Sequence, residues 1–284
     1  MEGIPPKKIT KQGEVKGSIG IGDVGIDIGT QTVAISSKHS VKLLELAPNV
    51  NSIDRKIKII QRKMERSKCS TNPNKYNDDG TIKRGNKDKW TFSNHYNKLK
   101  VLRKELYRKQ SEIRKQDHYK LINELLNLGN KFYVETMNYK GLQARAKETT
   151  INKKGKYNKK IRFGKSLANK APSMLLTMLD NKLKWNGEML YKINTFKCKC
   201  SQYNHFNDTY NKKELKDRWN NDISIQRDMY SAFLIMNVNS DLESINRDKC
   251  FETYDNFKKL HDKEIQRLKM LKANGNKLIS SMGI

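Results

Sequence analysis

The sequence has little cysteine, little proline and no long apolar run. Its 284 residues include four cysteines and five prolines. Four unevenly spaced cysteines do not make a disulfide framework, which indicates a reducing compartment. No apolar run approaches the roughly 18 residues that a membrane-spanning helix needs, and residues 1–20 lack the apolar segment of a signal peptide. We therefore expect a cytoplasmic protein with no membrane partner.

Acidic residues are scarce relative to basic ones. The chain has 30 Asp and Glu residues against 58 Lys and Arg residues, a formal net charge of +28. An excess of this size predicts a polyanionic partner, and nucleic acid is the default candidate. We therefore expect association with DNA, and hence with the nucleoid.

The first half of the chain changes from strand-like to helical patterns. Residues 1–22 mix Pro, Gly and Lys, and we expect this basic segment to be disordered on its own. Residues 24–28, 32–36 and 41–46 predict strands joined by short turns, which indicates an antiparallel meander. Residues 50–126 predict an inserted helical hairpin, with Ser52 as the N-cap of its first helix and a basic second helix over 94–126.

The second half returns to alternating strands and helices. The patterns predict strands over 131–139 and 189–195 and helices over 174–185 and 227–236. Between them, residues 197–222 form a polar, basic insert. Residues 239–284 predict a helical tail. The fold class that these patterns favour is α/β.

Three acidic residues lie at the edges of elements that should be buried. Asp27 ends the first strand, Glu135 lies in a later strand, and Asp228 begins a helix. Buried carboxylates are costly unless they are paired or bound to a cation. If the three converge, they form an oxygen site suited to Mg²⁺. The alternative is that Glu135 and Asp228 are surface or capping residues, since a helix N-terminus favours an acid.

Three motifs that contain these acids resemble those of RuvC-like nucleases, within the ribonuclease H-like superfamily. In chain order they are GIDIGTQTVAIS (25–36), YVETMNYKGLQAR (133–145) and QRDMYSAFLIMN (226–237). With a basic hairpin between the first two, the arrangement is similar to the TnpB (OrfB) family of transposon-associated nucleases, relatives of type V CRISPR effectors.

The resemblance implies a fold, a site and a reaction. The fold is a RuvC-like nuclease domain over 23–238, with a mixed sheet flanked by helices on both sides and a basic insert at 197–222 that binds the target. Asp27, Glu135 and Asp228 become the catalytic triad that binds Mg²⁺ or Mn²⁺. The implied activity is metal-dependent cleavage of DNA, directed by a guide RNA.

The resemblance is incomplete in three regions, one of which is the third motif, where Tyr230 and Phe233 replace the Asn and the alanine-rich face that the pattern often has. The family carries a zinc ribbon with paired CxxC motifs before the third motif, whereas this insert has Cys198 and Cys200 one residue apart and no second pair. A tetrahedral zinc site needs four ligands, so we expect no zinc and regard these cysteines as weak candidates. Family members also carry a substantial domain before the first motif. The chain therefore resembles a truncated copy, for which a separate N-terminal fragment is a candidate partner.

Basic and aromatic residues provide candidate nucleic-acid contacts. Lys and Arg clusters bind phosphates without reading bases, and rings set among lysines stack on unpaired bases. The candidates are Lys104, Arg108, Lys115, Lys153, Lys154, Lys159, Lys160, Arg162, Tyr203, His205 and Arg227. For the rings, packing within a polar loop is an equally good explanation. For the helix over 94–126, the alternative is a solvated charged face.

Two other functions stay open at this point. A protein of the same fold could bind nucleic acid without cutting it, as a repressor or a remnant. GIDIGTQTV also resembles the first phosphate loop of actin-like sugar kinases and chaperone ATPases. Those proteins need a second DxG turn and a Gly-rich adenosine motif, neither of which we find, and the charge of +28 suits a small-molecule kinase poorly.

Overall fold

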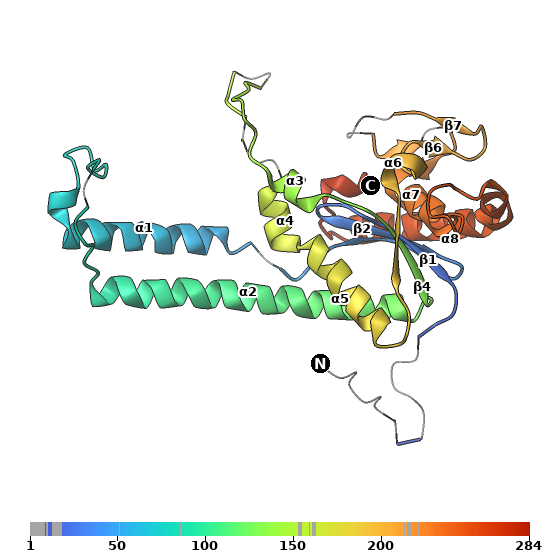
Figure 1. The fold of residues 1–284 in the computed structure, drawn as a ribbon, viewed down its shortest axis with the longest axis horizontal. Coiled ribbons are helices and arrows are strands. Elements are labelled where there is room, and N and C mark those ends of the chain that lie inside the picture. Colours follow the sequence, from blue (N-terminus) through green and yellow to red (C-terminus); the bar gives the residue numbers. More distant parts are fainter. Residues whose placement is uncertain are drawn as a thin grey trace. The chain divides into compact units, whose positions relative to one another are not determined.

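The computed structural model divides the chain into two compact units (Figure 1). It describes residues 9, 11–12, 19–50, 52–85, 87–152, 155–158, 160, 163–212, 214, 217–220 and 222–284. The smaller unit is Pro48–Gln116, and the larger unit combines Met1–Ala47 with Asp117–Ile284. The long helix α2, Asn94–Leu126, contributes residues to both units.

A mixed sheet forms the centre of the larger unit. Its strand order in the described part of the chain is β3-β2-β1-β4-β5. The first three strands form the predicted antiparallel meander, and β4 and β5 continue the sheet parallel to β1. The strands are β1 (Asp23–Ile28), β2 (Thr32–Ser37), β3 (Val41–Glu45), β4 (Lys131–Glu135) and β5 (Leu190–Ile193). The sequence-based prediction of an α/β fold is therefore confirmed.

Apolar residues on both faces of the sheet are covered by helices. On one face, Ile26 and Val134 belong to a core that includes the last turns of α2 and helix α5 (Pro172–Lys184). On the other face, Ala34 and Leu43 pack with α7 (Arg227–Met236) and α8 (Arg247–Ala273). Alternation along each strand thus gives the sheet two buried faces.

Gly25 lets α7 cross β1 closely. A Cβ atom at this position would lie 2.0 Å from the carbonyl oxygen of Ala232 and 2.5 Å from the amide nitrogen of Met236. Every α7 residue from Met229 to Met236 is buried. The backbone contact at Gly25 therefore sets where α7, and the acid in its first turn, lies above the sheet.

The smaller unit contains the predicted helical hairpin. Helix α1 (Asp54–Thr71) is followed by the short 3₁₀ helix η1 (Pro73–Lys75) and then by α2. Ile60, Met64 and Leu99 form its apolar core. The expected capping role of Ser52 is wrong: Ile53 precedes the helix, and the Ser52 hydroxyl bonds to the Asp54 carboxylate at 2.9 Å.

Shorter elements complete the larger unit. Most of the expected disordered segment 1–22 lies outside the described residues, but Ile19 packs against the core, and the Gly20 amide donates to the Leu126 carbonyl at 2.7 Å. Across the described chain, no helix combines the length and apolar character needed to cross a membrane. The remaining elements are α3 (Tyr139–Gln143), α4 (Gly164–Lys170), α6 (Thr195–Cys198), β6 (Tyr203–Asn204), β7 (Thr209–Tyr210), β8 (Trp219–Asn220), β9 (Ile225–Gln226) and η2 (Ser280–Met282).

Candidate active site

Asp27 and Glu135 come from neighbouring parallel strands. Ile26 of β1 lies opposite Val134 of β4, so Asp27 and Glu135 follow at the carboxyl ends of the two strands. Ile26 and Val134 face α2 and α5. Because successive side chains alternate between faces, the two acids point to the α7 side of the sheet.

Asp228 reaches the same side from the first turn of α7. Gln226 caps this helix, and its side-chain oxygen accepts a hydrogen bond from the Met229 amide at 2.8 Å. The backbone amide of Gln226 in turn donates a hydrogen bond to Nε2 of the His261 ring at 3.1 Å. These bonds fix the start of the helix and therefore the position of Asp228.

All three acids line one pocket of about 430 Å³. Residues 29–32, in the turn from β1 to β2, form another part of its wall. Three basic residues, Lys212, Arg218 and Arg227, also line it. The structure thus brings together three acids that are separated by up to two hundred residues in the sequence, and it sets cations beside them.

Burial and mutual repulsion dominate the electrostatics of the pocket. Burial raises the pKa of Asp27 well above its ordinary value, and the negative charges of Asp228 and Glu135 raise it further. Arg227 and Arg218 oppose this shift. Burial also raises the pKa of Glu135 to about 7. A carboxylate whose charge is this poorly compensated favours a bound cation.

Asp228 already has cationic partners. Its side chain is 15 % exposed, and its carboxylate lies 3.3 Å from the Arg227 guanidinium and 3.7 Å from that of Arg218. Among the described residues, no three His, Cys, Asp or Glu side chains are placed to chelate one ion as they stand. The carboxylate donors fit Mg²⁺ by type.

The predicted basic contacts fall in different places. Lys153, Lys154, Lys159 and Arg162 lie outside the described residues. Lys104 and Lys115 are exposed on α2, whereas Arg108 there makes two 2.8 Å hydrogen bonds to Glu105. Lys160 donates to the Lys147 carbonyl at 3.2 Å. Arg227 belongs to the acid pocket, where it binds Asp228.

Tyr203 and His205 are core residues, which corrects their assignment as base-stacking side chains. His205 is fully buried, and its Nδ1 lies 2.6 Å from the Tyr230 hydroxyl. Burial lowers its pKa to about 4, so the ring is neutral near pH 7. Tyr203 is 5 % exposed and donates to Asp208 at 2.8 Å. Neither ring is free to stack on a nucleotide.

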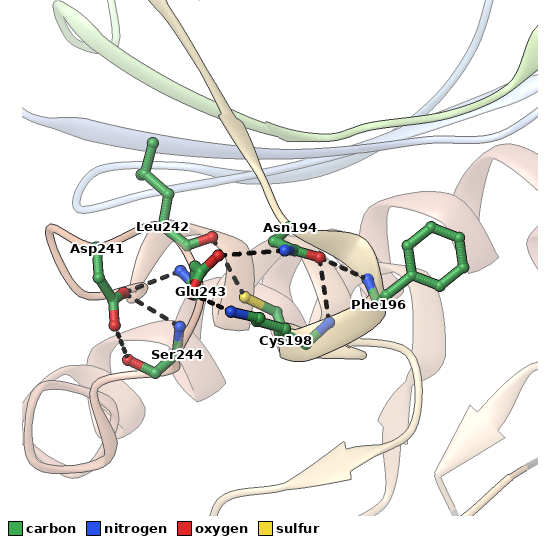
Figure 2. A network of polar contacts seen from close by, with 8 residues as sticks. Asn194, Phe196, Cys198, Asp241, Leu242, Glu243 and Ser244 are labelled. Atoms are coloured by element: carbon green, nitrogen blue, oxygen red, sulfur yellow. Dashed lines mark hydrogen bonds and ion pairs between the residues drawn. The ribbon is translucent and has the colours of Figure 1, made fainter.

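Cys198 and Cys200 are buried free thiols that hydrogen-bond to each other, which lowers the pKa of Cys198 and raises that of Cys200. Cys198 belongs to α6, which Asn194 caps through the amides of Phe196 and Lys197 (Figure 2). The Cys198 sulfur also lies 3.8 Å from the Leu242 carbonyl oxygen. In this structure the cysteines therefore help to hold α6 against the loop before α8.

The sequence did not reveal Arg218, Lys212 or Ser281 as lining residues of the acid pocket. Arg218 and Lys212 were two of many basic residues in the insert. Ser281 follows α8, and no motif marks it. Its segment is fixed by a hydrogen bond from the Trp219 indole to the Gly283 carbonyl at 2.8 Å, a contact between residues far apart in the chain.

No model of a known protein family matches this chain, and no curated protein matches it either.

Proposed function

We propose that the chain is a TnpB-like DNA endonuclease with a ribonuclease H-like fold, and that it hydrolyses phosphodiester bonds with the help of a divalent metal. One observation carries this proposal. Asp27, Glu135 and Asp228, from three separate elements, line one pocket in which burial raises the pKa of two of them. Such a group of buried carboxylates costs stability and needs a cation to offset it.

The fold around the pocket supports the proposal. A mixed sheet with helices on both faces agrees with what the resemblance to RuvC-like nucleases implies. The first and third motifs meet at the contact between Gly25 and α7. The second motif supplies Glu135 from the strand beside β1.

In the proposed site, Asp27, Glu135 and Asp228 hold Mg²⁺ or Mn²⁺. When bound, a pair of these ions supplies an activated water for attack on phosphorus and stabilises the leaving 3′-oxygen. Arg218, Arg227 and Lys212 place positive charge in the same pocket, where it attracts the substrate phosphate.

The partners follow from the same proposal. DNA is the substrate, and a guide RNA selects the site to be cut. The charge of +28 supplies the attraction to either nucleic acid. Because the proposed substrate is DNA, we propose that the protein acts in the cytoplasm, at the nucleoid.

A protein that binds nucleic acid without cutting it is the second candidate. The observation that favours it is the pairing of Asp228 with Arg218 and Arg227, which neutralises one acid of the triad. In that case the basic residues of the chain bind phosphates and the pocket performs no chemistry.

Cleavage assays on the full chain distinguish the two candidates. The chain is purified from its host with any bound RNA, the RNA is sequenced, and DNA matching it is incubated with Mg²⁺ or Mn²⁺. Asp27→Asn, Glu135→Gln and Asp228→Asn should each lower the cleavage rate by about a thousandfold or more, because each removes a metal ligand. Glu252→Gln, on the exposed surface of α8, is the control and should cut normally. Binding without any cutting by the parent chain would favour the second candidate.

A further inference from the structure

A second pocket adjoins the acid pocket. It has a volume of about 300 Å³, at the lower end of the range of about 300–1,000 Å³ for small-ligand sites. Glu135 and Met137 line both pockets. A ligand that occupies the second pocket therefore lies next to the acids.

The walls of the second pocket mix apolar and polar side chains, and they include one buried polar group without a partner. Leu176 and Leu190 belong to the lining and lie in or against the core beneath the sheet. The Tyr139 hydroxyl is buried, and no hydrogen-bond partner for it exists among the described residues. Burying a hydroxyl without a partner is costly, so this group points to a ligand that the pocket receives.

Tyr139 is held in place and lies close to the acids. It is the first residue of α3, which Asn138 caps by accepting a hydrogen bond from the Gly141 amide at 2.9 Å. Its ring packs against the core below the sheet. Burial raises the pKa of Tyr139, and the negative charge of Asp27 raises it further, so the hydroxyl lies near enough to the acid pocket to be influenced by it.

The charged lining residues of the second pocket are one lysine and two acids. Lys192 on β5 is exposed at the lining and carries a positive charge. Asp180, the other charged side chain there besides Glu135, is paired with Lys184 at 2.7 Å. The pocket thus combines apolar side chains such as Leu176 and Leu190 for a planar ring, a hydroxyl for a hydrogen bond and a cation for a phosphate.

Resting on the proposed function, we propose that the second pocket binds the base of an unpaired nucleotide next to the phosphodiester bond at the acids. Enzymes that handle single bases hold them between apolar side chains and contact their polar edges. A base paired within a duplex cannot enter a separate pocket. The substrate strand is therefore unpaired at the point of cleavage.

Binding measured without metal tests this inference. The affinity of the full chain for an oligodeoxythymidine is compared with that for an abasic oligomer of equal length, in EDTA at fixed salt. The ratio of the two affinities isolates the contribution of the bases. Tyr139→Phe, which removes only the hydroxyl, should lower this ratio about two- to tenfold. Leu176→Trp, which fills the pocket, should lower it about five- to a hundredfold.

The control is Tyr254→Phe, which removes a hydroxyl from a ring on α8 that packs against Phe206 and Phe257 and should leave the ratio unchanged. An unchanged ratio in Tyr139→Phe and Leu176→Trp overturns the inference. If Leu176→Trp does not fold, Tyr139→Phe alone decides. This test measures no cleavage, so it is independent of the nuclease proposal. If the two variants lower the affinity ratio but the parent chain never cuts DNA, the base pocket is supported and the nuclease proposal fails.

Discussion

Glu135 makes the stability of the chain depend on pH. Burial raises its folded pKa to about 7, from an ordinary value of 4.5. Between these values the folded chain keeps the proton that the unfolded chain releases. The contribution of Glu135 to the free energy of unfolding is therefore fully present below about pH 4.5 and is lost as the pH rises through 7. Asp27, with its pKa raised too, acts in the same direction.

We predict that Glu135→Gln makes the free energy of unfolding less dependent on pH. From about pH 5 to pH 8, the free energy of unfolding of the metal-free parent should fall relative to that of the variant by about 2–3 kcal/mol. Urea unfolding followed by circular dichroism measures the difference. Glu252→Gln controls for the loss of a surface carboxylate. Parallel curves for the parent and Glu135→Gln would show that this carboxyl titrates as an ordinary one.

The three acids could be predicted from the sequence, whereas their cationic neighbours could not. Each acid lies in a motif at the end of a strand or the start of a helix. Arg218 has no such mark, because its role depends on meeting Asp228 in the fold. His205 was misjudged for a similar reason: its ring contacts Phe251 and Tyr254 of α8, about fifty residues later in the chain.

The helices and strands follow from the spacing of apolar residues. The meander over β1, β2 and β3 and the long helix α2 match their predicted positions. The residue at which the smaller unit ends, within α2, was harder to predict. The pattern indicates one helix over 94–126, but the unit ends at Gln116 because Ile122 and Leu125 pack against the sheet instead. A single helical period does not reveal which core a helix joins.

The crossing of α7 over β1 should be sensitive to one methyl group. Gly25→Ala places a Cβ atom 2.0 Å from the Ala232 carbonyl oxygen, and neither backbone can yield without moving the helix. We predict a loss of about 3 kcal/mol or more in the free energy of unfolding, as in overpacked cores. Because α7 carries Asp228, cleavage should fall as well, even under conditions in which the variant is fully folded.

Gly29→Ala is the matched comparison for this prediction. The nearest atom to its added Cβ is the Thr32 hydroxyl oxygen at 3.3 Å, a side-chain atom that can shift by a few tenths of an ångström. Its effect on stability should be much smaller than that of Gly25→Ala. Thermal or urea unfolding of the two variants gives the comparison. Equal losses would mean that the contact between β1 and α7 is looser than the structure indicates.

The positive charge of the chain affects its binding to nucleic acid, whether or not the acids catalyse a reaction. Basic residues outnumber acidic ones in the sequence as a whole, but some of those in the structure are already paired. Arg108 bonds to Glu105, Lys258 to Asp262 and Lys197 to Glu243. Composition alone could predict a polyanionic partner, but not which cations are available to it. Lys104 and Lys115 on α2 are exposed, and the described contacts include no ion pair for either.

Removing these two charges should weaken the salt dependence of DNA binding. Each neutralised phosphate contributes about −0.9 to the slope of log affinity against log salt on a duplex, or about −0.7 on a single strand. Lys104→Gln with Lys115→Gln should therefore flatten the slope by up to about 1.8 or 1.4. Fluorescence titrations over a range of salt concentrations measure it. Lys197→Gln with Lys258→Gln removes the same charge from lysines already paired with carboxylates, and should change the slope less. If both double variants flatten it equally, binding depends on net charge and not on α2.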